Sequence, residues 1–200
     1  MREARLAKLF WLALTCVAVA TAPASAGSSV KVTTQNYDIS GANGAALMSA
    51  MDHKGPKHGL LTRAIAQTRY SVSWALETAE SGSDCRLKRA TATLHLNYMY
   101  PRVSSQMSAD LNRRWQRFMA GVRKHEEQHG AIARKMVQVA ERSITGLEIA
   151  NDRGCRKVNA EMKRRVNAIY ADYERRQESF DAREHRPNGN VEGLVGALIR

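Results

Sequence analysis

Two stretches in the first half of the chain alternate between apolar and polar residues. Large apolar residues recur at every second position over residues 67–77, and a similar alternation returns over residues 86–100. A period of two is typical of a strand with one buried face. Turn-forming residues at 81–84 separate the two stretches, so we predict an antiparallel hairpin. A further strand is predicted over residues 30–39, followed by a short helix over residues 45–51.

The second half of the chain has the period of a helix. Ser108 is suited to begin a helix, and after it apolar residues recur at helical spacing as far as Leu147. The turn-forming cluster at residues 151–154 ends this pattern, and a second helix is predicted from Cys155, with Phe180 as its last regular apolar position. These elements predict an α+β fold in which a small antiparallel sheet packs on a long α-helical hairpin.

The two ends of the chain differ from this domain, which is predicted to span residues 27–186. Residues 1–26 have a basic start, a short apolar run and a small-x-small sequence, as a signal peptide does. Cleavage near Ala26 and Gly27 would release a periplasmic or secreted protein. Residues 187–200 are predicted to be a flexible C-terminal tail, whose apolar part, 191–199, either docks on the domain or lies on a membrane.

Two cysteines remain once the signal peptide is removed, Cys85 and Cys155. In an oxidising compartment an isolated pair favours a disulfide, and we predict that these two residues are bonded. The bond would close a long loop and stabilise the fold by ~4 kcal/mol through restriction of the unfolded chain. The alternative is a pair of unpaired buried thiols.

The chain is strongly basic, with a formal net charge of +12. A protein with this charge is attracted to anionic surfaces, so we expect contact with an anionic envelope surface. The basic residues are spread along the predicted helices without interleaved aromatic residues, which argues against specific nucleic-acid binding. The sequence indicates no oligomeric state.

One motif carries chemistry, the HExxH sequence formed by His125, Glu126 and His129 within the first long helix. Residues four apart lie on one face of a helix, so both imidazoles can contact a single metal ion. The carboxylate of Glu126 lies beside the first imidazole, where it can take a proton from a water molecule activated by zinc. We predict a Zn²⁺ site with both histidines as ligands and Glu126 as the catalytic residue. The alternative is a pair of hydrogen-bonded core histidines.

A catalytic zinc site needs a third protein ligand and one open position. Lys135 occupies the position where metzincins have their third histidine, which excludes that subclass. Glu148 lies about 28 Å further along a continuous helix, so it qualifies only if the helix ends early. The other candidates are on the returning helix.

The returning helix is expected to reach the level of the two histidines near residues 174–180. The candidate ligands there are Glu174, Glu178, Asp181 and His185. We favour His185, because imidazole is a common zinc ligand, with Asp181 as its supporting partner or as a rival ligand. Tyr173 faces inward at the same level and is expected to contact a substrate oxyanion or to support a ligand.

Several of these residues also occur in a bacterial family of unknown function whose members are described as predicted secreted zinc-dependent proteases. The chain resembles this family over most of its predicted mature part. The shared features are Tyr37-Asp-Ile-Ser-Gly41, Gly55-Pro56, Thr68, Trp74, Cys85, Trp115-x-x-Phe118, the HExxH motif and Cys155. Phe180-Asp181 and His185 resemble the family's aromatic-Asp pair and later His-Gly, although Arg186 follows the histidine here. The resemblance implies a zincin-like metallopeptidase domain.

The expected function is therefore that of a secreted or periplasmic zinc metallopeptidase, a hydrolase that cleaves peptide or protein substrates. The main alternative is a non-catalytic envelope-binding protein that retains a structural or vestigial zinc site. A third reading is a zinc-dependent amidase that acts on cell-wall peptide, which is favoured only by the compartment and the positive charge.

Overall fold

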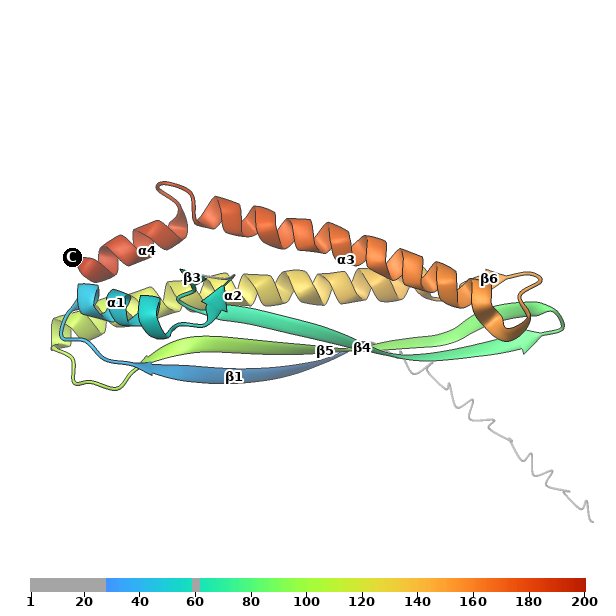
Figure 1. The fold of residues 1–200 in the computed structure, drawn as a ribbon, viewed down its shortest axis with the longest axis horizontal. Helices are drawn as coiled ribbons and strands as arrows, with labels where there is room; N and C mark the ends of the chain where they lie inside the picture. The colour runs from blue at the N-terminus through green and yellow to red at the C-terminus, as the bar shows by residue number, and fades with distance from the viewer. Residues whose placement is uncertain (1–27, 59–61) are drawn as a thin grey trace, which may run out of the picture.

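The computed structural model describes residues 28–58 and 62–200, so the predicted signal peptide of residues 1–26 lies outside the described residues (Figure 1). The structure is a mixed α and β arrangement. Its strands and helices follow the chain in the order β1 (Ser29–Ile39), α1 (Gly44–Lys54), β2 (Lys57–His58), β3 (Thr62–Arg63), β4 (Gln67–Ser81), β5 (Asp84–Val103), α2 (Ala109–Ile144), β6 (Glu148–Ile149), a 3-10 turn η1 (Arg153–Cys155), α3 (Arg156–Glu184) and α4 (Asn190–Ile199).

The predicted β4–β5 hairpin is confirmed, but the sheet is mixed and not purely antiparallel. Its main strand order is β1-β5-β4, with the short β6 beside β5. The strands β4 and β5 pair antiparallel, whereas β1 runs parallel to β5. The cause is the connection through α1: both Gln35, near the end of β1, and Gln67, at the start of β4, pair with Met99 of β5. Since β4 starts where β1 ends, the returning strand β5 has the direction of β1.

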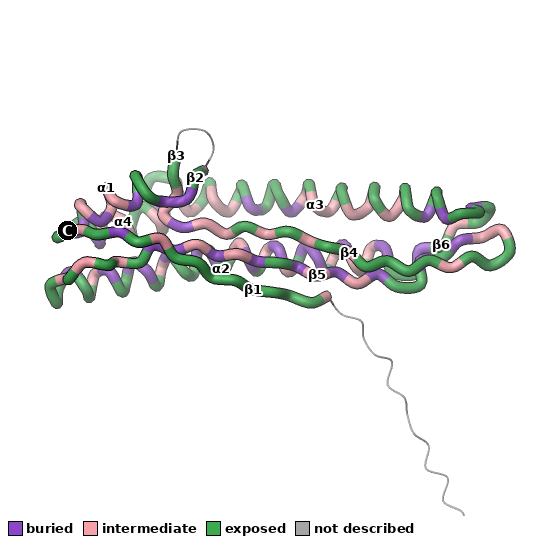
Figure 2. Tube along the Cα trace, turned by 60° about the horizontal axis from the view of Figure 1, so that its bottom comes forward, coloured by how far each residue is buried: buried purple, intermediate pink, exposed green. Residues whose placement is uncertain are grey.

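The sheet is buried along its central strand. Figure 2 shows buried residues along β5 and mostly exposed ones along β1. On β5 the side chains of Leu94 and Leu96 face α2, whose Trp115 and Phe118 join them in the main core. Burial of each large apolar side chain contributes about 2 kcal/mol, so this layer supplies much of the stability. It also fixes the rotation of α2 relative to the sheet.

The two long helices form the predicted hairpin, with α3 returning along α2 (Figure 1). The turn between them is fastened by the disulfide bond between Cys85 on β5 and Cys155. Both cysteines lie in a second, smaller core cluster with Leu87, Ile144 and Val158. This cluster closes one end of the hairpin, and the HExxH residues lie toward the other end.

The C-terminal residues form a helix, α4, in place of the flexible tail that the sequence suggested. Its apolar residues Val191, Leu194, Val195 and Leu198 have helical spacing, and Leu198 is fully buried. The helix packs against α1 and α2, so the apolar end of the chain docks on the domain. Within the described residues, none of the helices is both long and apolar enough to cross a membrane.

Candidate metal centre

The helix α2 presents the two histidines of the motif to the interior. The side chain of Ser108 caps the helix by accepting a hydrogen bond from the backbone N–H of Leu111, at 3.2 Å. His125 is only 8% exposed, and His129 follows one turn later on the same face. Their Nε2 atoms lie 3.2 Å apart. Two imidazoles from one helix therefore meet at a single point.

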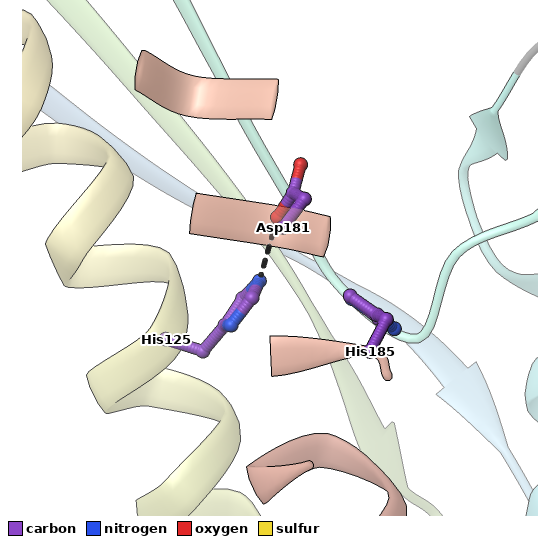
Figure 3. Close-up of side chains that lie close together, drawn as sticks. All are labelled: His125, Asp181 and His185. Carbon is purple, nitrogen blue, oxygen red and sulfur yellow. Dashed lines mark ion pairs between the residues drawn. The ribbon is translucent and has the colours of Figure 1, made fainter. Parts of the chain in front are cut away.

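The helix α3 brings a carboxylate to this point. The Oδ1 atom of Asp181 is 2.9 Å from Nε2 of His129 and 3.3 Å from Nε2 of His125. Figure 3 shows the side chains of Asp181 and His125 pointing toward each other. Around a tetrahedral zinc ion with ligand distances near 2.0–2.1 Å, neighbouring ligand atoms are roughly 3.3 Å apart. The three atoms thus have the mutual spacing of ligands to one ion.

Two polar atoms at this point lack a hydrogen-bond partner. Among the described residues, neither Oδ1 of Asp181 nor Nδ1 of His125 forms a hydrogen bond, although both atoms are buried. Oδ1 nevertheless lies within ion-pair distance of both imidazoles. A buried polar atom without a partner is costly, and a bound cation would compensate Oδ1. The residues present fit a divalent metal ion.

Gln177, also on α3, orients the second imidazole. Its Nε2 donates to the backbone carbonyl oxygen of His129 at 3.1 Å, so its Oε1 is the atom that faces Nδ1 of the ring, at 2.6 Å. Because Oε1 only accepts, Nδ1 of His129 must carry the proton. The neutral ring then presents the lone pair of Nε2 toward Asp181, as a metal ligand does.

The charges of the cluster shift its pKa values. Burial alone would raise the pKa of Asp181, but the two imidazoles outweigh it and hold the pKa well below its usual range. Burial lowers the pKa of His129, whereas its contacts with Asp181 and Gln177 raise it and prevail. Without a metal ion, the cluster therefore favours a carboxylate beside a protonated imidazole.

His185 and Asp181 are both brought to the histidines, at different distances. His185 follows the last residue of α3, and its ring centroid is 5.5 Å from that of His125. Possible ligand atoms of His125, Asp181 and His185 lie within 4.8 Å of one another. Asp181, which the sequence analysis named as a supporting or rival ligand, contacts both imidazoles directly. Asp181 therefore lies where a third ligand of one ion would lie, and His185 is near enough to approach the same ion.

Glu126 lies against the sheet, beside Thr68 of β4. It is 5% exposed, and its Oε2 accepts a hydrogen bond from the hydroxyl of Thr68 at 2.6 Å. Burial raises the pKa of this carboxyl, while Thr68 and the two histidines offset part of the rise. A carboxylate with a raised pKa is suited to take up a proton near neutral pH.

Among the described residues, the tyrosine that lines the cavity beside the cluster is Tyr70 of β4, and not the predicted Tyr173. Tyr173 is buried in the main core, and the guanidinium of Arg176 lies over its ring. The hydroxyl of Tyr70 instead donates to Oε2 of Glu174 at 3.0 Å, and both residues line the cavity beside the histidines. Burial, and then Glu174, raise the pKa of Tyr70 to about 12, so its hydroxyl stays protonated and can donate.

A cavity of about 600 Å³ opens beside the cluster. The motif residues and Asp181 line it on the helical side, and Thr68 and Tyr70 line it on the side of β4. Apolar residues from α1, α2 and α4 complete the wall. This volume is typical of a pocket that accepts part of a ligand, here with a histidine–carboxylate cluster on its surface.

The fold and the site together define a mixed α and β protein with a buried histidine–carboxylate cluster at a cavity. The chain belongs to the family described as "Bacterial protein of unknown function (DUF922)", which matches residues 34–189. No curated protein and no solved structure matches the chain.

Proposed function

We propose that this protein is a zinc-dependent metallopeptidase that acts in the periplasm or outside the cell. The observation that carries the proposal is the meeting of His125 Nε2, His129 Nε2 and Asp181 Oδ1 beside a buried glutamate. The donor set of two imidazoles and one carboxylate is the set that catalytic zinc sites use. The zincin-like arrangement implied by the resemblance has the same ingredients: an HExxH helix next to a sheet and a third ligand from a later helix.

The chemistry follows from the positions of the side chains. When bound, zinc lowers the pKa of a water molecule to near neutrality and polarises a peptide carbonyl. The carboxylate of Glu126 would hold the proton taken from the attacking water and would pass it to the leaving amine. Thr68 holds the carboxylate in place through the 2.6 Å hydrogen bond to Oε2. Gln177 keeps the imidazole of His129 in the tautomer that binds metal.

The sheet offers a way to hold an extended peptide. Within the described part of the chain, β4 pairs only with β5, so its other edge carries unpaired backbone groups. Gln67, Thr68 and Tyr70 at the start of β4 line the cavity. A peptide that pairs with this edge would run past Glu126 and the histidines. This arrangement favours an extended peptide or protein segment as the substrate.

The test compares two neighbouring glutamates. Glu126→Gln removes the proton acceptor and is expected to lower the rate of casein hydrolysis by a factor of roughly 10²–10⁴ while zinc content is unchanged. Glu127→Gln is the matched control, because Glu127 is exposed to solvent on the same helix. Both variants should keep the circular dichroism spectrum of the wild type.

Two outcomes would contradict the proposal. If purified wild-type protein stays free of metal after incubation with zinc, the site is not a zinc site. If the zinc-loaded wild type hydrolyses no peptide in a broad substrate library, the protein is better described as a non-catalytic envelope-binding protein that retains zinc. Its net charge of +12 would then be the feature to pursue, in assays with anionic surfaces.

A further inference from the structure

The C-terminal helix α4 forms one wall of the cavity beside the histidine–carboxylate cluster. Val191, Leu194 and Val195 of this helix line the same cavity as His125, Glu126 and Asp181. Val191 and Val195 are only half-buried, so their side chains still have surface to lose on contact with a ligand. We propose that α4 builds an apolar substrate subsite and selects peptides with a large aliphatic or aromatic side chain next to the cleaved bond. This inference rests on the proposed peptidase function.

The helix is held firmly enough to serve as a wall. Leu198 is fully buried, and its carbonyl oxygen accepts a hydrogen bond from Nη1 of Arg114 on α2 at 2.6 Å. A Cβ atom at Gly44 would collide with the backbone of Leu198, and one at Gly121 would collide with the side chain of Leu194. The two glycines therefore allow α4 to approach both α1 and α2 closely.

The start of α4 is also linked to the histidine–carboxylate cluster through Glu184. Glu184, the last residue of α3, accepts a hydrogen bond from Nδ2 of Asn190 at 2.9 Å, and its Oε2 lies 3.6 Å from Nδ1 of His125. One carboxylate thus contacts both the first residue of α4 and a predicted metal ligand. The position of α4 is therefore coupled through Glu184 to the position of His125.

The facing surfaces make the subsite apolar. Met48 of α1, Ile65 of the segment before β4 and Val122 of α2 line the cavity together with the α4 residues. Val122 lies three residues before His125 and four before Glu126, so its side chain is a neighbour of each of them on the surface of the helix. An apolar surface that adjoins the cluster in this way would receive a substrate side chain close to the reacting bond.

The charged residues of the cavity do not reverse this preference. Glu192 of α4 accepts a hydrogen bond from the backbone N–H of Asn188 at 2.5 Å, which engages its carboxylate at the start of the helix. Glu174 accepts from Tyr70, and Nη1 of Arg63 donates to the carbonyl oxygen of Gly55 at 2.7 Å. Asp52 of α1 also lines the cavity, so the aliphatic side chains share the wall with this carboxylate and supply its apolar part.

The first experiment measures cleavage of peptides that differ only in leucine, phenylalanine, glycine or glutamate at one position. Wild-type protein is expected to prefer leucine or phenylalanine to glycine. In the double variant Val191→Ala/Val195→Ala, the ratio of kcat/KM for the leucine peptide to that for the glycine peptide should fall about ten-fold. Small changes in an apolar pocket change discrimination on this scale. Ile199→Ala is the matched control, since Ile199 is on the same helix but 47% exposed.

The second experiment needs no catalysis. In the Glu126→Gln background, loaded with zinc, binding of the leucine and glycine peptides is measured by calorimetry with and without the two valine substitutions. Tighter binding of the leucine peptide that disappears in the valine variant supports the subsite. Equal binding of the two peptides overturns it, as does a preference that the valine variant keeps. A wild-type protein that cleaves peptides without apolar preference would likewise overturn the subsite while leaving the peptidase function intact.

A charge substitution provides an independent check. Val195→Lys places an ammonium group in the wall and is expected to shift preference from leucine toward glutamate by about ten-fold or more. If the preference for leucine persists in this variant, with zinc content and the circular dichroism spectrum unchanged, then α4 does not contact the substrate side chain and the proposal fails.

Discussion

Asp152 and Asp181 lie near opposite ends of α3, and their carboxylates have different hydrogen-bond partners and neighbours. Asp152 is 3% exposed, and its oxygens accept hydrogen bonds from the backbone N–H groups of Lys157 and Val158 at 2.9 and 2.8 Å. It therefore caps the start of α3. Asp181 has a buried oxygen that forms no hydrogen bond among the described residues, and this oxygen faces two imidazoles.

This contrast separates a carboxylate with a structural role from one proposed to bind a metal ion. Burial of a polar group is tolerated where its hydrogen bonds are complete, as they are for the carboxylate of Asp152. At the other end, the buried Oδ1 of Asp181 has only the two imidazoles beside it, where a bound cation would satisfy it. Changes at the disulfide-bonded end should therefore affect stability without affecting metal binding, and changes at the cluster should do the opposite.

The largest effect on stability is expected from loss of the disulfide bond. Cys85→Ser/Cys155→Ser opens a loop whose ends are 70 residues apart, which should lower the free energy of unfolding by about 4 kcal/mol. For a domain of this size the thermal midpoint should fall by roughly 10 °C, as measured by differential scanning calorimetry. Zinc bound per molecule should be unchanged at temperatures well below the midpoint. A folded double variant that no longer binds zinc would show that the two ends are coupled.

The next effect concerns Asp181, the proposed third metal ligand. Asp181→Asn keeps the shape of the side chain but removes its negative charge, and zinc affinity should fall by roughly 100-fold or more. Asp172→Asn is the matched control on α3, because Asp172 is about as accessible as Asp181 but pairs with Arg175 and Arg176 instead of the histidines. Competition titration with a chromogenic chelator measures both variants. An Asp181→Asn protein with unchanged zinc affinity would exclude Asp181 as a ligand and point to His185.

A smaller effect is expected from the residue that orients His129. Gln177→Ala removes both hydrogen bonds to His129, at Nδ1 and at the backbone oxygen, and should weaken zinc binding by about 10-fold. Gln177→Glu keeps an acceptor for Nδ1 and should recover part of the affinity. The same chelator titration separates the two variants. If Gln177→Glu binds zinc no better than Gln177→Ala, the tautomer of His129 does not depend on this side chain.

The sequence was sufficient to predict the elements whose signals are local. The two strands of the hairpin, the two long helices and the bond between Cys85 and Cys155 are confirmed, because periodicity and cysteine count report on them directly. The parallel pairing of β1 with β5 joins segments far apart in the chain, and nothing in either segment specifies the direction of its partner. The docking of α4 likewise depends on a surface that only the folded domain creates.

The returning helix shows why ligands on it were harder to predict. Residues 173, 177, 181 and 185 follow one another in steps of four, and each step advances roughly 40° around a helix. Gln177 and Asp181 face the histidines, whereas Tyr173 has rotated into the core. Which pair faces the motif depends on how α3 packs against α2, and the sequence does not specify this packing. The four-residue spacing of Gln177 from Asp181 indicates a shared helix face, but Tyr173 and Gln177 have the same spacing, so the spacing alone does not identify the pair.

The smallest effect should come from the capping carboxylate at the disulfide-bonded end. Asp152→Asn leaves one acceptor oxygen for two backbone N–H groups, so the free energy of unfolding should fall by about 1 kcal/mol. The substitution is the same chemical change as Asp181→Asn, made at the other end of the same helix. Denaturant unfolding should therefore register Asp152→Asn in the metal-free and the zinc-loaded protein alike, while chelator titration gives wild-type affinity. A loss of zinc affinity in Asp152→Asn comparable to that in Asp181→Asn would mean that the two carboxylates do not divide into a structural and a functional one.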